Sequence, residues 1–453
     1  MRLSTITTTT VATAVAVVAT TTTVQGWVTT TVPGPSWSRS STNSMNVRVA
    51  TTGTTTPSTT TAVYSTTTTS VSTTSTPSIT TTTTNEVPLS PEYSAALEMI
   101  VQTVNTNIPE SMKKSTSASS GESSNNNMVS LLLHFAKEYM MASQNANSAV
   151  VAGTTIPSPN APTDPISSAK RFLAGVQYGL QYGLPSSPDL YTFDVSHVAL
   201  DGTQEAYGGI DYYSFGCNFF RPVMAFTSVE INVMNSMSNL EQIRTQVHNG
   251  ENVILFANHQ SEADPQVVSA CLDLAGYGDI AKEMIYVAGH KVTTDPLAIP
   301  FSMGRNLLCI HSKKHIDADP DTKPIKQKQN LKAMNALLTS LKDESGGSIV
   351  WVAPSGGRDR RNVETNTVPI APFDSKTIDM FRLMGNKSKR NTHYYTMAMV
   401  SYDLCPPPDF VEAGVGERRN VRFSPVGIVV GKELESVGGL ESRQAFCTNA
   451  QNQ

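Results

Sequence analysis

The pattern of apolar and polar residues divides the chain near residue 211. Beyond this point short apolar runs alternate with segments whose apolar residues recur at helical spacing. Five runs are typical of buried strands: residues 252–257, 285–288, 307–310, 349–353 and 396–400. This alternation predicts an α/β domain over residues 211–447, with a mixed sheet covered by helices on both faces and the functional loops at the strand ends.

Residues 89–210 carry a helical pattern instead. Apolar residues recur at helical spacing over 93–101, 129–141 and 169–178, and the polar stretch 115–127 is typical of a loop. We therefore predict a small N-terminal helical bundle in front of the α/β domain.

The first 88 residues are dominated by threonine and serine, and no acidic residue occurs before Glu86. Such a segment lacks the apolar surface needed to offset the entropy of ordering, so we expect a disordered leader. Residues 1–26 are typical of a signal peptide, with an apolar stretch too short to span a bilayer, and residues 27–88 of a transit leader. A secreted protein with a mucin-like stalk has a similar composition, and this alternative stays open.

Charge and cysteine content narrow the class of protein. The chain has 33 basic and 37 acidic residues, and removing the leader, with three arginines and Glu86, leaves 30 against 36, a net charge of −6. This mildly acidic body argues against nucleic acid as a partner. Five cysteines without metal-type spacing predict reduced, mostly buried thiols. After the leader no apolar stretch approaches the roughly 18 residues of a transmembrane helix, so at most peripheral membrane contact is expected.

The most informative motif is Asn-His-Gln-Ser-Glu-Ala-Asp-Pro at residues 258–265, between the first strand and a predicted helix that Asp264 caps. At such a turn Asp264 can hold one imidazole nitrogen of His259 while the other faces a cleft, which makes the histidine a general base. Taken alone, this spacing favours a capped helix with an exposed histidine over a catalytic pair.

Two further polar blocks follow strands. In the block 355–360, Gly356 and Gly357 let backbone amides approach an anion, and Arg358 and Arg360 can grip phosphate oxygens. The second block is the basic cluster 313–315. Either block alone could be a solvated turn, but together at strand ends beside His259 they favour a phosphate pocket.

These blocks, with Pro-Phe-Ser-Met-Gly-Arg-Asn at 300–306, resemble those of the glycerolipid acyltransferases, and in particular the soluble plastid glycerol-3-phosphate acyltransferases, over about residues 211–431. The resemblance implies that family's fold and transfer of an acyl group from acyl carrier protein or coenzyme A to the 1-hydroxyl of glycerol-3-phosphate, giving lysophosphatidate, without a cofactor or metal. It implies that His259 is the base and Asp264 orients it. It further implies the following substrate-binding residues: Lys314, His315, Arg358 and Arg360 for the phosphate, and Arg305 within the block that shapes the acceptor site.

The leader has its own resemblance. Trp27 directly follows Gly26, as in the bipartite leaders of algae with secondary plastids, where an aromatic residue heads the transit peptide. This implies delivery to the plastid stroma.

Four lysines, at positions 323, 326, 328 and 332, lie between the basic cluster 313–315 and the first turn of a predicted helix at 331–341. A basic surface there would attract an acidic carrier protein.

The chain departs from the resembling family at His290, where an acidic residue is usual, and at Thr396, where a proline is usual. No serine or cysteine has the setting of a nucleophile, so direct attack by the acceptor hydroxyl is favoured over an acyl-enzyme. Alternatives are a lysophosphatidate acyltransferase, a metal-dependent hydrolase using His259, Glu262 and Asp264, and a non-enzymatic lipid-binding module.

Overall fold

A computed structural model describes residues 88–108, 128–158, 160–181, 191, 210–228, 232–233, 236–312, 316–317, 319–409, 417–436 and 440–453. The predicted leader and the loop 115–127 lie outside these residues. The chain from Thr83 to Gln453 forms one compact unit.

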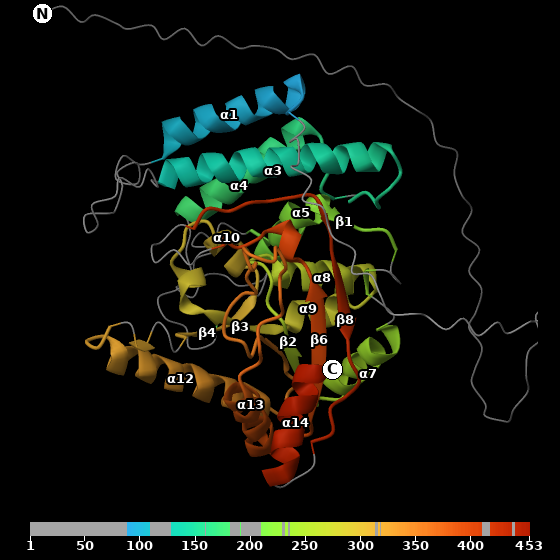
Figure 1. The fold of residues 1–453 in the computed structure, drawn as a ribbon, viewed down its shortest axis with the longest axis vertical. Coiled ribbons are helices and arrows are strands. Elements are labelled where there is room, and N and C mark those ends of the chain that lie inside the picture. The colour runs from blue at the N-terminus through green and yellow to red at the C-terminus, as the bar shows by residue number, and fades with distance from the viewer. Residues whose placement is uncertain are drawn as a thin grey trace, which may run out of the picture. The chain divides into compact units, whose positions relative to one another are not determined.

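Three helices form a layer at one end of this unit: α1 (Pro91–Asn107), α3 (Met128–Val151) and α4 (Pro165–Gln181) (Figure 1). They confirm the three predicted helices, and each extends beyond the predicted range. Proline stands at the start of α1 and α4, where its missing N–H costs the helix nothing. Phe135 of α3 and Phe172 of α4 pack edge to face with their ring centroids 5.2 Å apart, and both join the hydrophobic core that lies against the sheet.

The main sheet has six strands in the order β4-β3-β5-β2-β6-β8. Their bounds are β2 (Asn252–Ala257), β3 (Ile285–Gly289), β4 (Asn306–Ile310), β5 (Ile349–Val352), β6 (Thr392–Val400) and β8 (Gly427–Val430). All pairs are parallel except β6 with β8, so the predicted mixed sheet is confirmed. Strand β6 begins four residues before the predicted range, and β8 was not predicted. A separate two-stranded parallel pair joins β1 (Met224–Ala225) and β7 (Ser424–Pro425).

Helices cover both faces of the sheet, as predicted. Val253 and Leu255 of β2 point into one hydrophobic core, and Ile254 and Phe256 point into the other, because side chains alternate along a strand. The first core includes residues of α5 (Tyr212–Phe220), α7 (Met237–His248) and α8 (Asp264–Leu274). The second includes residues of α12 (Lys323–Lys342), α13 (Ser375–Ser388) and α14 (Leu440–Asn452).

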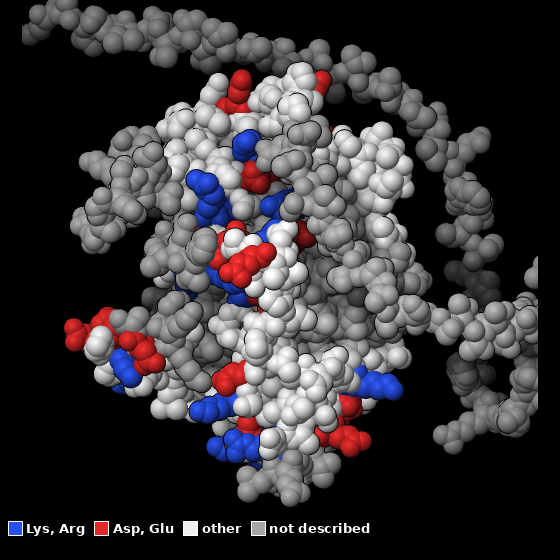
Figure 2. Space-filling view, viewed as in Figure 1, with Lys and Arg blue, Asp and Glu red and all other residues white. Residues whose placement is uncertain are grey.

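Short elements complete the fold: α9 (Gly278–Glu283), α10 (Ile299–Ser302) and the 3-10 turns η1 (Arg221–Val223), η2 (His290–Thr293) and η3 (Tyr402–Leu404). None of the helices described is long and apolar enough to cross a membrane. Side chains of both signs stand next to one another in the middle of the face shown in Figure 2.

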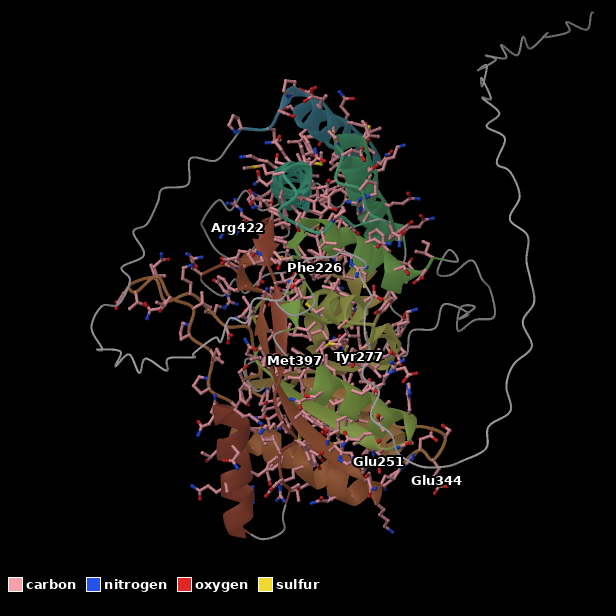
Figure 3. All side chains as sticks on the ribbon, turned by 90° about the vertical axis from the view of Figure 1, so that its right-hand side faces the viewer. Phe226, Glu251, Tyr277, Glu344, Met397 and Arg422 are labelled. Carbon is pink, nitrogen blue, oxygen red and sulfur yellow. The ribbon has the colours of Figure 1, made fainter. Side chains whose placement is uncertain are left out.

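Because the strands are parallel, several predicted motifs that follow them begin at the same edge of the sheet. The carboxyl ends of β2, β4, β5 and β6 lie at this edge, which we call the carboxyl edge. Figure 3 shows the length of the sheet: Glu251, directly before β2, lies at the amino edge, Met397 of β6 lies in the middle, and Arg422 lies beyond the carboxyl edge. His259 and Arg358 follow β2 and β5, so the fold itself brings their motifs together.

Candidate active site

The turn between β2 and α8 places His259 against Asp264. The His259 Nδ1 atom lies 2.8 Å from Asp264 Oδ2, and the imidazole is 27% exposed while the carboxylate is fully buried. Because an ionised carboxylate only accepts hydrogen bonds, Nδ1 carries the proton and Nε2 carries the lone pair. No hydrogen-bond partner for Nε2 is present among the described residues. The ring stands edge-on to Trp351 of β5, with centroids 5.8 Å apart.

Asp264 does not cap the helix, so this detail of the sequence prediction is wrong. The helix begins at Asp264 itself, after Ala263, and the carboxylate turns back toward the preceding turn. It accepts hydrogen bonds from the backbone N–H groups of Gln260 (2.7 Å) and Ser261 (3.0 Å) and from the hydroxyls of Ser261 (2.9 Å) and Ser401 (2.6 Å). These four donors and His259 compensate for its burial and fix its orientation.

The turn is also tied to the end of β6. Gln260 Oε1 accepts from the backbone N–H groups of Ser401 (2.8 Å) and Tyr402 (3.2 Å), and Asn258 exchanges two hydrogen bonds with the backbone of Met399. Ser401 and Gln260 were not predicted as parts of the site. The polar run directly after a fully buried strand was the available signal for Gln260, whereas Ser401 lies 137 positions from Asp264.

The arginine motif lies directly beside this turn. The Asp359 N–H donates to the His259 carbonyl over 2.6 Å, and the Asp359 carboxylate accepts from Ala371 N (2.8 Å). Burial raises the pKa of Asp359. Gly356 has φ +71°, which favours glycine, and neither Gly356 nor Gly357 has a heavy atom within 4 Å of the position of an added Cβ. The two glycines therefore leave open space in which an anion can approach the backbone.

Arg358 belongs to an ion-pair network. Its Nη1 lies 3.3 Å from Glu262 Oε1 and its Nη2 lies 2.5 Å from Glu417 Oε2. Arg419 pairs with the other oxygen of Glu262 (2.7 Å) and with Asp295 (2.8 Å). Desolvation opposes ionisation of Glu262, but the charges of Arg419 and Arg358 outweigh it and lower its pKa to about 2. Glu262 is thus a structural carboxylate, and its two arginine partners count against a role as metal ligand.

Other predicted residues are placed as follows. The Arg360 guanidinium donates to the Pro408 carbonyl, and desolvation together with the charge of Arg358 lowers its pKa. Lys314 and His315 lie outside the described residues, although the strand that precedes them, β4, ends at the carboxyl edge. Arg305 directly precedes β4 and is 3% exposed, and its guanidinium lies 4.5 Å from the centre of the Tyr213 ring.

Neither thiol nor metal chemistry is indicated here. All five cysteines are free, and burial raises the pKa of Cys405, the one next to the arginine network, to about 12. Within the described part of the chain, no three His, Cys, Asp or Glu side chains are grouped so that they could hold a metal ion. His290 stacks on His311 with centroids 4.5 Å apart.

A histidine that a buried aspartate aligns, beside a glycine turn with open space around it, can deprotonate a hydroxyl. Comparison with known proteins agrees: residues 236–400 match the acyltransferase family. This segment contains β2 to β6, the dyad and Arg358.

More specifically, the chain is similar to chloroplastic glycerol-3-phosphate acyltransferases, which confirms the resemblance stated from the motifs. Identity is 40% over 246 residues with that of Arabidopsis thaliana (54% of this chain, 51% of the relative), 40% over 262 residues with that of Spinacia oleracea (58% and 53%) and 38% over 239 residues with that of Pisum sativum (53% and 50%). The chain spans about half the length of these curated relatives.

Proposed function

We propose that this chain transfers an acyl group from a thioester to the 1-hydroxyl of glycerol-3-phosphate, giving lysophosphatidate. The observation that carries the proposal is the His259–Asp264 pair, on a turn whose His259 carbonyl accepts a hydrogen bond from Asp359 of the arginine motif. The names of the similar proteins supply the acceptor. A thioester of acyl carrier protein or coenzyme A supplies the acyl group, and no cofactor enters the reaction.

In this mechanism His259 Nε2 takes the proton of the acceptor hydroxyl while the hydroxyl oxygen attacks the carbonyl carbon of the thioester. Asp264 keeps Nδ1 protonated and stabilises the imidazolium that forms. When the tetrahedral intermediate collapses, the C–S bond breaks and the imidazolium returns its proton to the leaving thiolate. Burial raises the pKa of the Cys405 thiol, so Cys405 is a poor nucleophile for an acyl-enzyme, and direct attack by the hydroxyl is favoured.

The acceptor phosphate would lie at the carboxyl edge. Arg358, Arg360 and the backbone at Gly356 and Gly357 are our candidates to hold it, and Lys314 and His315 join them on the resemblance alone. Arg358 is already charged and oriented by two carboxylates, so little ordering is needed when the phosphate binds. On the resemblance alone, Arg305 belongs to the block that shapes the acceptor site.

A transfer assay on residues 83–453 tests the proposal. Acyl carrier protein and coenzyme A thioesters are each offered with glycerol-3-phosphate and with lysophosphatidate, and His259→Ala is the control. Product from glycerol-3-phosphate that depends on His259 supports the proposal. Transfer to lysophosphatidate alone would favour the runner-up function, and hydrolysis without transfer would contradict both.

We further propose delivery to the plastid, which the chloroplastic relatives support, and to its stroma through the two-part leader. A fusion of residues 1–80 to a fluorescent protein should reach the plastid of an alga with a secondary plastid, and Trp27→Ala should stop it outside. Secretion of a heavily glycosylated fusion would support the mucin-like alternative.

A further inference from the structure

Arg305 is a buried positive charge without an acidic partner among the described residues. Its side chain is 3% exposed, and its Nε and Nη1 atoms have no hydrogen-bond partner there. The remaining nitrogen, Nη2, donates to Cys217 Sγ over 3.4 Å, and the guanidinium lies 4.5 Å from the centre of the Tyr213 ring. A buried charge is costly when nothing compensates for it, so Arg305 calls for an anion at this place.

The neighbouring tyrosines do not supply that anion. Burial raises the pKa of Tyr213 to about 12 and raises the pKa of Tyr286 as well, so both phenols stay neutral. The side chain of Cys217 is the remaining described group that contacts the guanidinium and can become negative.

Cys217 also differs from the other cysteines in its access to solvent. Cys271, Cys405 and Cys447 are buried, whereas Cys217 and Cys309 are partly exposed. Burial raises the pKa of the Cys309 thiol to about 12, and no cation among the described residues counters it. The chain thus carries two partly exposed thiols, one against a guanidinium and one without, which form a natural pair for comparison.

We propose that Cys217 is an oxidative modification site, at which hydrogen peroxide converts the thiol to a sulfenate that Arg305 holds. The thiolate sulfur attacks one peroxide oxygen, an S–O bond forms and the O–O bond breaks. Sulfur loses two electrons, and the departing hydroxide takes the remaining peroxide proton and leaves as water. The new oxygen can accept hydrogen bonds from the donors of Arg305 that now lack partners, and the guanidinium balances its charge.

The test uses the reduced full chain, dilute hydrogen peroxide and dimedone, a reagent that traps sulfenic acids, with peptide mass spectrometry to measure labelling at each cysteine. We expect Cys217 to be labelled at least about ten-fold faster than Cys309, because the Arg305 guanidinium lies against the Cys217 sulfur and its free donors can hold the new sulfenate oxygen. Equal rates at the two positions would overturn the proposal. No acyl transfer is measured, so the result is independent of the proposed function.

Two variants test the role of the cation. Arg305→Met should bring the labelling rate of Cys217 down to that of Cys309, whereas Arg305→Lys should retain most of it. Unchanged labelling in a folded Arg305→Met protein would refute the pairing. If that variant does not fold, the wild-type chain in urea replaces it: the ratio of the two labelling rates should fall toward one, and a ratio equal to that of the native chain would refute the proposal.

Discussion

Replacing Asp264 by Asn changes the dyad while keeping its size. In the native site Oδ2 accepts from His259 and Gln260, and Oδ1 accepts from Ser261 and Ser401. An asparagine has one accepting oxygen. Its NH₂ group must therefore face the backbone N–H of either Gln260 or Ser261, depending on which way the amide is turned. If the NH₂ group faces His259, the imidazole proton moves to Nε2 and no base remains. In the other orientation the imidazolium loses its charged partner.

We therefore expect kcat to fall by about 10³- to 10⁴-fold, or roughly 4 to 5.5 kcal/mol of transition-state stabilisation. The backbone N–H that loses its acceptor should lower the free energy of unfolding by about 1–3 kcal/mol. Ser401→Ala is the matched control: it removes one donor from Asp264 but leaves the charge, so kcat should fall only several-fold, or about 1 kcal/mol.

The assay measures kcat and KM for glycerol-3-phosphate at saturating acyl donor, with urea unfolding in parallel. A kcat for Asp264→Asn within about ten-fold of wild type, with the same pH profile, would contradict this prediction. So would a Ser401→Ala variant as damaged as Asp264→Asn, because the effect would then follow from local packing rather than from charge and tautomer.

Three further predictions concern the charged residues. Arg358→Ala should raise KM for glycerol-3-phosphate at least about ten-fold and leave the donor KM unchanged, whereas the neighbouring Arg361→Ala should change neither; equal effects on both substrates would count against phosphate binding. The pKa of Glu262 is lowered from 4.5 to about 2, so the stability it contributes is present above about pH 4.5 and lost as the pH falls toward 2; urea unfolding should show a loss of about 1–3 kcal/mol over this range, and Glu262→Gln should flatten it. Charge reversal at Lys326 and Lys328, in the first turns of α12, should lower kcat/KM several-fold for acyl carrier protein substrates but not for coenzyme A substrates; insensitivity of the carrier-protein rate to both the reversals and salt would place its docking surface elsewhere.

The strands could be predicted where the local pattern is simple. Strand β2 is a continuous run of buried residues and was predicted with its observed bounds, whereas β6 starts with Thr392 and His393, which are only half-buried and interrupt the apolar pattern. The start of helix α8 was predicted correctly, but the role of Asp264 as its N-cap was not. A carboxylate at this position can turn either toward the N–H groups of the helix or back toward the preceding turn.

The dyad could be predicted because its two members lie on one turn, only five positions apart. The network around Arg358 could not, because Glu262 and Glu417 lie 96 and 59 positions away from it, and no local pattern connects them. Arg305 was assigned to the acceptor site with its whole block, and this assignment stays a prediction.

The hydrogen bond from Asp359 N to the His259 carbonyl joins the turn of the proposed base to the turn of the proposed phosphate site. Because Asp264 also holds His259, the proposed function gives the distance between Nε2 and the phosphate a fixed length. A hydroxyl one carbon nearer to the phosphate, or one farther away, would then lie at the wrong distance from Nε2. On the proposed function, the backbone of the two turns would therefore decide which hydroxyl of the acceptor is acylated.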